Sequence, residues 1–467
     1  MVSFSPLDII VIILFFVALV IIGFLPGRKA SQTAEGYLLS GRNVSLFVFI
    51  LTNVATWYGG ILGVGEFTYK YGLLSWFTQG FPYYVFAILF ALFFAKKIRA
   101  ASLFTIPDKL EAAYGKKVGS LSALLIFILV SPAPYLLMSA SLISLIFKID
   151  LLPALIISVI LSSVYLFKSG YKSDLYTDVF QFFVMFVGFI LIVIVSFTNL
   201  GGINFLKVNL PSTHMDFTGG SSPSFIIVWF LIALWTFADP GFHQRCYAAK
   251  SGNVAKYGIL ISIIFWILFD FLTTATGLFA RASIPEIHNP VLAFPIYAEK
   301  ILGPGLKGIF YAGMFATIIS TLNSFLFLSA TTFGRDFLSK LNKKVDDGSL
   351  KNYTRIGLAV TSVIAVVLAY FIDSVIQLWY TIGSICIPGI ILLIFGAYYK
   401  KFLVTPRIAL IEILAGSIGS LGWYLIRSQF MNVAIISDVE PLLVGFVAAS
   451  IVHLIGKVAT TSPIRNY

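Results

Sequence analysis

Charge is the scarcest property of this chain. Only 11% of its 467 residues are charged, whereas 59% are hydrophobic and the mean hydropathy is +0.96. A water-soluble domain cannot carry so little charge on its surface, so a soluble protein is excluded. Apolar stretches of about twenty residues, each long enough to cross a bilayer as a helix, recur along the whole sequence. They leave no room for a separate soluble domain.

Histidine and cysteine are also rare. Cys246 and Cys386 fall at or within apolar stretches and have neither metal-ligand spacing nor a disulfide framework. No phosphate-binding loop is present, which argues against an ATP-driven pump. No cluster of catalytic groups forms around the scattered histidines, so we expect no enzyme. They are His214, His243, His288 and His453.

The apolar stretches predict an all-α integral membrane protein with about thirteen transmembrane helices. The predicted spans cover residues 6–25, 45–70, 74–95, 117–147, 150–168, 172–199, 223–248, 254–280, 304–335, 353–372, 375–399, 405–426 and 440–459.

Basic residues are distributed asymmetrically about these spans. If the N-terminus lies outside, 25 of the 32 Lys and Arg residues fall in cytoplasmic segments and seven outside. Basic residues concentrate on the cytoplasmic side of membrane proteins, so we expect a multi-pass protein of the cell membrane with a cytoplasmic C-terminus. The same bias explains the net charge of +12 without a nucleic-acid partner.

Two predicted spans are unsuited to continuous helices. Span 45–70 contains the glycine-rich stretch from Thr56 to Gly65, and span 223–248 contains Asp239-Pro240-Gly241. Transporters built from inverted repeats interrupt the first helix of each repeat near the bilayer midplane, although these glycines alone would also suit close helix packing. We therefore expect a single transporter domain. Its parts are an extra helix at 6–25, repeats of five spans at 45–199 and 223–399, and two extra helices at 405–459.

Span 304–335 carries a polar face. Its hydroxyl residues recur at i, i+3, i+4 and i+7, on one side of a helix, and hydroxyl oxygens together with free carbonyls suit a hard cation such as Na⁺. Alternatively, these side chains bond to their own backbone or join helices. They are Thr317, Ser320, Thr321 and Ser324.

Several motifs resemble the sodium:solute symporter family along essentially the whole chain. The resemblance implies a LeuT-type fold with a five-plus-five inverted repeat, one extra N-terminal helix and two extra C-terminal helices. It also implies Na⁺ as the coupling ion and a small-molecule solute as the partner. The motifs are GVGEFTYKYG at 63–72, TIPD at 105–108 with Glu111 and Tyr114-Gly115, YTD at 176–178 with Gln181, QR at 244–245 with AAK at 248–250, and STL at 320–322 leading to Asp336.

The resemblance also implies two cation sites. Matching motifs places the main sodium site at the Asn53, Thr56 and Thr317 carbonyls and the Ser320 and Thr321 hydroxyls. A possible second cation site comprises Asp178, Ser320 and Ser324. Its geometry is open, because Asn323 replaces a small hydroxyl residue there and Asp178 alternatively lies on the inner exit path.

By the same resemblance the solute lies against the two helix breaks. The implied substrate-binding residues are Trp57, Tyr58, Gln79, Trp235, Thr236 and Tyr380. Aromatic walls with few charges suit a neutral or zwitterionic solute, although each ring is equally explained as helix packing. Ala55 stands where proline transporters of the family carry an aspartate, and Gln79 stands where some sugar transporters carry a glutamate. Both differences argue against proline and simple hexoses as the solute.

The intramembrane carboxylates Asp239, Asp270 and Glu66 are further candidates for contact with ion or solute. Asp239 alternatively caps the broken helix or pairs with Arg245. The expected function is sodium-coupled uptake of a small solute by alternating access. A proton-coupled carrier, or an uncoupled carrier or sensor on the same fold, is the alternative. Oligomeric state is left open.

Overall fold

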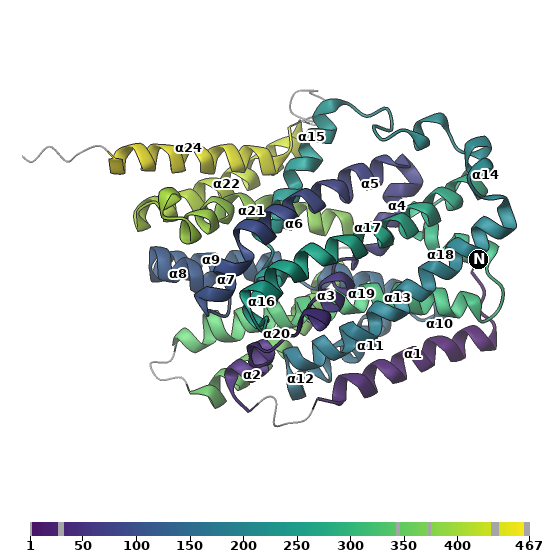
Figure 1. The fold of residues 1–467 in the computed structure, drawn as a ribbon, viewed down its shortest axis with the longest axis horizontal. Helices are drawn as coiled ribbons and strands as arrows, with labels where there is room; N and C mark the ends of the chain where they lie inside the picture. The colour runs from purple at the N-terminus through teal and green to yellow at the C-terminus, as the bar shows by residue number, and fades with distance from the viewer. Residues whose placement is uncertain (1, 27–31, 342–345, 372–374, 431–438, 462–467) are drawn as a thin grey trace, which may run out of the picture.

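The computed structural model describes residues 2–26, 32–341, 346–371, 375–430 and 439–461. In these ranges the chain forms a bundle of helices (Figure 1), twelve of which are long and apolar enough to cross a membrane. The remaining expected span, 45–70, is a pair of shorter helices, α3 (Leu46–Ala55) and α4 (Ile61–Tyr71). The prediction of about thirteen spans is therefore confirmed, and span 45–70 contains the break that the sequence predicted.

The other helices of the first half include the predicted spans and several short helices between them. They are α1 (Pro6–Phe24), α2 (Ala34–Leu39), α5 (Leu74–Gln79), α6 (Phe81–Phe93), α7 (Ala95–Ala101), α8 (Ile106–Tyr114), α9 (Lys116–Leu129), α10 (Ala133–Phe147), α11 (Leu151–Ser163), α12 (Leu166–Ser169) and α13 (Tyr171–Leu200).

The second half contains the second break and the C-terminal helices. Its helices and short helical turns are α14 (Gly202–Asn209), η3 (Ser212–Met215), α15 (Pro223–Ile232), η4 (Ala233–Phe237), α16 (Pro240–Ala248), α17 (Gly252–Ser283), η5 (Pro290–Leu292), α18 (Ala293–Ile301), α19 (Leu306–Thr331), η6 (Thr332–Phe337), η7 (Leu338–Leu341), α20 (Asp347–Phe371), α21 (Val375–Tyr398), η8 (Lys400–Phe402), α22 (Pro406–Gln429) and α24 (Pro441–Thr461).

Several expected boundaries differ from the structure. Span 74–95 is interrupted at Gly80, and span 117–147 is interrupted at 130–132, where Pro132 provides no backbone N–H. Residues 97–116, which lie between two predicted spans, contain helix α8. Helix α20 begins at Asp347, six residues before the predicted span 353–372. Hydropathy does not detect the two interruptions because both sides of a kink remain apolar.

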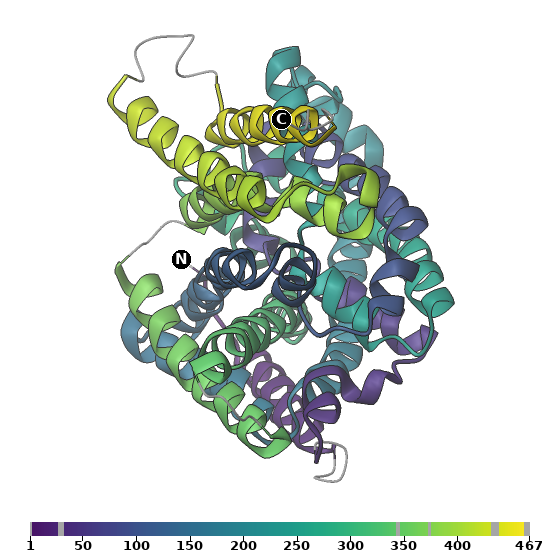
Figure 2. The ribbon, with the colours of Figure 1, turned by 90° about the vertical axis from the view of Figure 1, so that its left-hand side faces the viewer.

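The two ends of the described chain lie at opposite ends of the bundle. Helix α1 begins beside α18, where the Ser3 hydroxyl donates to the Glu299 carboxylate at 2.7 Å. Helix α24 ends at the opposite end of the bundle, the end at which α8 lies (Figure 1). The second view looks along the helices, with α22 and α24 together at one edge (Figure 2). This arrangement agrees with an odd number of crossings.

Helix α19 lies at the centre of the bundle. In the most apolar part of this span 89% of the residues are buried, the largest share among the candidate membrane spans of the described chain. It crosses α13 closely at Gly188 and Gly313, where a Cβ on either glycine would lie 3.1–3.2 Å from the other's Cα. The close crossing places the polar face of α19 against neighbouring helices.

Candidate functional site

The first helix break frees backbone carbonyls between α3 and α4. The Thr56 amide still donates to the Thr52 carbonyl at 3.2 Å, but the Trp57 amide turns to the Val54 carbonyl at 3.2 Å. Trp57 therefore does not make the helical i−4 bond to Asn53. Such carbonyls need another partner, because buried backbone groups are rarely left unpaired.

Two hydroxyls of α19 face this break. The Ser320 hydroxyl donates to the Ala55 carbonyl at 2.7 Å, and the Thr321 hydroxyl donates to the Thr56 carbonyl at 2.9 Å. Both hydroxyls also lie near the Thr317 carbonyl, at 3.0 and 3.2 Å. Five oxygens of two helices therefore converge in a buried position, which is the donor set that a small hard cation prefers.

Of the predicted main-site residues, four are part of this contact. The structure brings together Thr56, Thr317, Ser320 and Thr321, and it adds the Ala55 carbonyl, which sequence reasoning did not name. Asn53 is 3% exposed, and its side-chain amide nitrogen has no hydrogen-bond partner among the residues that the structure describes. It lies one turn before Thr56 on α3. The sodium role of all five residues stays a prediction.

The second helix break separates α15 and η4 from α16. Asp239 caps α16, since its carboxylate accepts a hydrogen bond from the Phe242 amide at 2.9 Å, and Pro240 occupies the first helical position. The sequence left open that Asp239 caps the broken helix, and the structure has this cap. Proline suits the first helical position, because the backbone N–H that it lacks would have no partner within the helix. The two breaks meet where Phe242 packs on Trp57, with ring centroids 5.7 Å apart.

Arg245 of α16 joins the two breaks to α13. Its guanidinium donates to the Thr56 hydroxyl at 2.6 Å and lies 3.6 Å from the Asp178 carboxylate. Arg245 is 4% exposed and Asp178 is fully buried. A buried charge is stable only with an opposite charge or hydrogen bonds, so this pair holds the helices together.

A second carboxylate lies one helical turn before Asp178. Asp174 is fully buried and accepts a hydrogen bond from the Ser324 hydroxyl at 2.7 Å. Its other oxygen and both oxygens of Asp178 have no hydrogen-bond partner in the described structure. The carboxylates of Asp174 and Asp178 lie near the single guanidinium of Arg245, so a further positive charge would be favourable there.

In the described structure the hydroxyls of the possible second cation site have other hydrogen-bond partners, and the site stays a prediction. Ser324 is bonded to Asp174 and Ser320 to the Ala55 carbonyl, and no hydrogen bond joins either hydroxyl to Asp178 in the described structure. Asn323, which stands where a small hydroxyl was expected, is hydrogen-bonded to the Tyr165 hydroxyl at 2.6 Å. Sequence reasoning missed Asp174, although its i, i+4 spacing from Asp178 was a signal.

The first group of predicted solute residues lies against α17. Trp57 packs on Trp266 with centroids 4.9 Å apart and on Tyr83 at 5.1 Å. The Tyr58 hydroxyl donates to the Trp266 carbonyl at 2.8 Å, and the Tyr58 ring lies 4.4 Å from that of Phe269. These rings form an aromatic wall beside the first break, and α17 was not expected to contribute to it.

The remaining predicted solute residues lie at the second break and at the end of α5. Trp235 packs on Gly383, where an added Cβ would lie 2.6 Å from the indole ring. The side-chain amide nitrogen of Gln79 and the almost fully buried Thr236 hydroxyl have no hydrogen-bond partner in the part of the chain that the structure describes. The side chain of Tyr380 lies outside the described part of the structure. Their role in solute binding stays a prediction.

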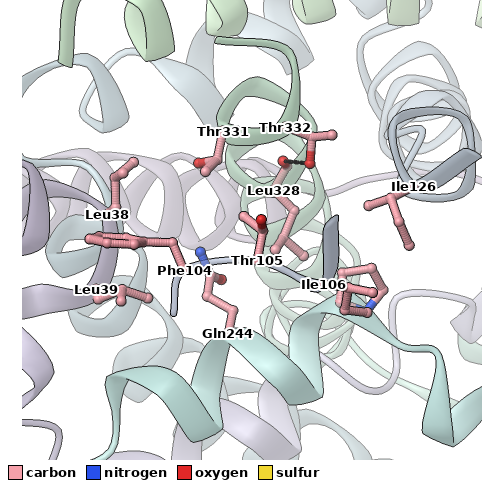
Figure 3. Close-up of a pocket in the computed structure, with 11 residues that line it drawn as sticks. Leu38, Leu39, Phe104, Thr105, Ile106, Ile126, Gln244, Leu328, Thr331 and Thr332 are labelled. Carbon is pink, nitrogen blue, oxygen red and sulfur yellow. Dashed lines mark hydrogen bonds between the residues drawn. The ribbon is translucent and has the colours of Figure 1, made fainter. Parts of the chain in front are cut away.

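A small pocket lies beside α16, and none of the predicted solute residues lines it (Figure 3). Gln244 points from α16 into the space that Thr105 and Thr331 also face. The Gln244 side-chain oxygen Oε1 and the Thr331 hydroxyl have no hydrogen-bond partner among the described residues. The pocket lies on the α8 side of the breaks. Its lining residues are Leu38, Leu39, Phe104, Thr105, Ile106, Ile126, Pro240, Gln244, Leu328, Thr331 and Thr332.

Glu66, the remaining carboxylate that the sequence singled out near the first break, is paired within its own helix. Lys70, one turn along α4, lies 2.5 Å from the Glu66 carboxylate. An i, i+4 ion pair at the end of a helix explains this residue without an ion or a solute.

The fold is that of sodium-coupled symporters with a LeuT-type architecture. A Na⁺-coupled sialic acid symporter of known structure superimposes with a TM-score of 0.83, covering 98% of each chain at 17% sequence identity. At this identity the likeness establishes the fold alone.

The sequence comparisons establish the family. The model of the sodium:solute symporter family matches residues 37–416, and the chain belongs to this family. It is 24% identical over 478 residues to the osmoregulated proline transporter of Bacillus subtilis (strain 168), covering 97% of this chain and 94% of the relative. It is 25% identical over 396 residues to the high-affinity choline transporter 1 of Drosophila melanogaster. That match covers 79% of this chain but only 63% of the relative's length.

These relatives are membrane transporters, in agreement with the expectation that the chain is not an enzyme. Family and fold together support sodium-coupled symport across a membrane. The resemblance inferred from the motifs is thereby confirmed.

Proposed function

We propose that this protein takes up a small neutral or zwitterionic organic solute together with Na⁺. The observation that carries the proposal is the contact of the Ser320 and Thr321 hydroxyls with the Ala55 and Thr56 carbonyls, at 2.7 and 2.9 Å. Without an ion, each hydroxyl hydrogen satisfies a freed carbonyl. With Na⁺, the hydroxyls turn their lone pairs to the ion, and the carbonyls bind it directly.

The main sodium site consists of the carbonyls of Asn53, Thr56 and Thr317 with the hydroxyls of Ser320 and Thr321. Its oxygens come from α3 and α19, so bound Na⁺ holds these helices together. A second cation site comprises Asp178, Ser320 and Ser324. The Asp178 carboxylate supports it: apart from its ion pair with Arg245 it accepts no hydrogen bond in the described structure, and a buried carboxylate without a hydrogen bond favours a nearby cation.

The solute binds between the two breaks, against Trp57, Tyr58, Gln79, Trp235, Thr236 and Tyr380. The unpartnered Gln79 nitrogen and Thr236 oxygen support this assignment, since a solute would supply their missing hydrogen bonds. The named solutes of the two relatives, proline and choline, both carry a positively charged nitrogen.

Coupling follows from where the ion sits. Na⁺ stabilises the state that is open to the outside and completes the solute site, and low internal sodium releases both inward. One ion crossing 100 mV supplies about 2.3 kcal/mol and a tenfold gradient about 1.4 kcal/mol, enough to concentrate a neutral solute several hundredfold. The pocket at Gln244 and Thr331 lies on the inward route.

We further propose that the N-terminus lies outside the cell membrane and the C-terminus in the cytoplasm. The asymmetry of Lys and Arg supports this orientation. The repeats comprise residues 45–199 and 223–399, with 6–25 and 405–459 as additional helices. The paired breaks at Thr56 and Asp239 support this division, because each lies in the first span of its repeat.

The test is a thermal-shift screen of the purified protein against a solute library, in sodium and again in potassium. Thr321→Ala removes the hydroxyl that faces Thr56. Thr354→Ala is the matched control, because Thr354 is equally buried but bonds only to its own helix at the Leu350 carbonyl. We expect a solute to stabilise the wild type and the control in sodium only, and Thr321→Ala in neither salt.

Equal stabilisation in both salts by the wild type and Thr321→Ala would contradict sodium coupling through this site. That result would favour the proton-coupled carrier, or the uncoupled carrier or sensor.

A further inference from the structure

Asp270 is a buried carboxylate in the middle of α17. It is 9% exposed and accepts a hydrogen bond from the Tyr84 hydroxyl, which in turn accepts one from the Trp76 indole at 3.2 Å. In the described structure no basic side chain forms a salt bridge with it.

Asp270 lies beside the aromatic wall of the first break. Trp266 lies one turn before Asp270 on α17, and its ring centroid is 4.9 Å from that of Trp57. The Trp266 backbone carbonyl accepts a hydrogen bond from the Tyr58 hydroxyl at 2.8 Å. On the other side, a Cβ at Gly80 would lie 2.8 Å from the Asp270 carboxylate. Gly80 directly follows Gln79 at the kink between α5 and α6, so the kink and the carboxylate are in contact.

An ionised carboxylate is costly inside a membrane unless a positive charge balances it. Tyrosine hydroxyls supply hydrogen bonds to such a group but no charge. The faces of Trp and Tyr rings attract cations, whereas they give little preference among uncharged groups of the same shape. A carboxylate beside an aromatic wall therefore recognises a positively charged nitrogen better than a neutral group of equal size.

We propose that Asp270 is the counter-ion for a positively charged nitrogen of the solute and thereby determines specificity. The transported solute is then an ammonium compound or a zwitterion, not an uncharged molecule. This inference rests on the proposed function, because it assumes a solute at the aromatic wall. It narrows the solute class that the sequence left as neutral or zwitterionic.

The experiment compares probes that differ in charge but not in shape. Choline, glycine betaine and L-proline carry a positively charged nitrogen, whereas 3,3-dimethyl-1-butanol is the uncharged carbon isostere of choline. Binding of each probe to the purified full-length protein in sodium is measured by thermal shift over a concentration series. We expect at least one charged probe to bind the wild type at least tenfold more tightly than the isostere.

Three variants locate the effect. Asp270→Asn removes the charge and should weaken binding of the same probe at least tenfold. Asp270→Glu keeps the charge and should retain part of the affinity, which covers the case in which Asp270→Asn does not fold. Glu412→Gln is the matched control, because Glu412 is a fully buried acid that pairs with His453, at 2.9 Å, between the two C-terminal helices. It should bind like the wild type.

Equal binding of choline and its isostere, wild-type affinity in Asp270→Asn, or no response to any charged probe at millimolar concentration would overturn the proposal. The sodium hypothesis is read separately, from the difference between sodium and potassium and from Thr321→Ala. If the charge selectivity persists in potassium, sodium coupling is contradicted but the role of Asp270 is not. If sodium-dependent binding keeps wild-type affinity in Asp270→Asn, the counter-ion role of Asp270 is contradicted but sodium coupling is not.

Discussion

Replacing Gly59 by alanine tests the contact between the first break and α19. An ideal Cβ at Gly59 would lie 2.4 Å from both Cβ and Oγ1 of Thr321. Carbon atoms pack at about 3.5–4.0 Å, so the two segments must separate by at least about 1 Å. The Thr321–Thr56 hydrogen bond, now 2.9 Å, would lengthen to nearly 4 Å and be lost.

The expected cost follows from these displacements. Overpacking of a tight contact costs about 1–3 kcal/mol, and a lost hydrogen bond about 0.5–1.5 kcal/mol. The ion-free state can accept the wider separation at the cost of the Thr321–Thr56 hydrogen bond, whereas oxygens of both segments must approach a bound cation to about 2.3–2.6 Å. The separation therefore destabilises the sodium-bound state more than the ion-free state. Each 1.4 kcal/mol is tenfold in affinity, so we expect Gly59→Ala to bind sodium at least tenfold more weakly.

The assay follows thermal stabilisation against sodium concentration, with potassium keeping the ionic strength constant. Gly422→Ala is the control, because a Cβ there meets nothing within 4 Å and the residue also lies in a transmembrane helix. A sodium midpoint in Gly59→Ala within twofold of the wild type would show that the Thr321 contact does not form the ion site.

Two further predictions concern buried charge. Asp174→Asn keeps an acceptor for Ser324 but removes one of the negative charges near Arg245. If a second cation binds there, sodium affinity should fall several-fold, whereas higher thermal stability with an unchanged sodium midpoint would contradict that site. His214 lies in the segment between α14 and α15, where its Nε2 donates to the Tyr69 carbonyl at 3.0 Å. Burial lowers the pKa of His214, and the positive charge of nearby Arg281 lowers it further. Its proton binds more weakly in the folded state than in the unfolded chain, so thermal stability should fall as the pH drops below about 6.5, and this fall should be smaller in His214→Gln.

The sequence predicted the breaks well because their causes are local. Proline removes a backbone donor wherever it stands, and a run of glycines lowers helix stability in any context. The hydroxyl face of α19 was also predictable, because a helix places residues i, i+3 and i+4 on one side. These features depend on the order of residues and not on which helices are neighbours.

The partners across helices were less predictable. Asp174 and Trp266 face the site only because α13 and α17 are rotated as they are, and this rotation is set by packing of the whole bundle. The Ala55 carbonyl was missed for a different reason. Which carbonyl is free depends on the residue at which the helix unwinds, and sequence patterns locate helix ends only to within a few residues.

Helix α19 joins elements from both repeats through one polar face. Ser320 and Thr321 bind the first break, and Ser324 binds Asp174 on α13. Arg245, from the second break, reaches the Thr56 hydroxyl and the Asp178 carboxylate. A movement of either broken helix against α19 therefore changes hydrogen bonds around both proposed cation sites. An ion that binds one arrangement better than the other shifts the balance between them, and this differential affinity is what coupled transport requires.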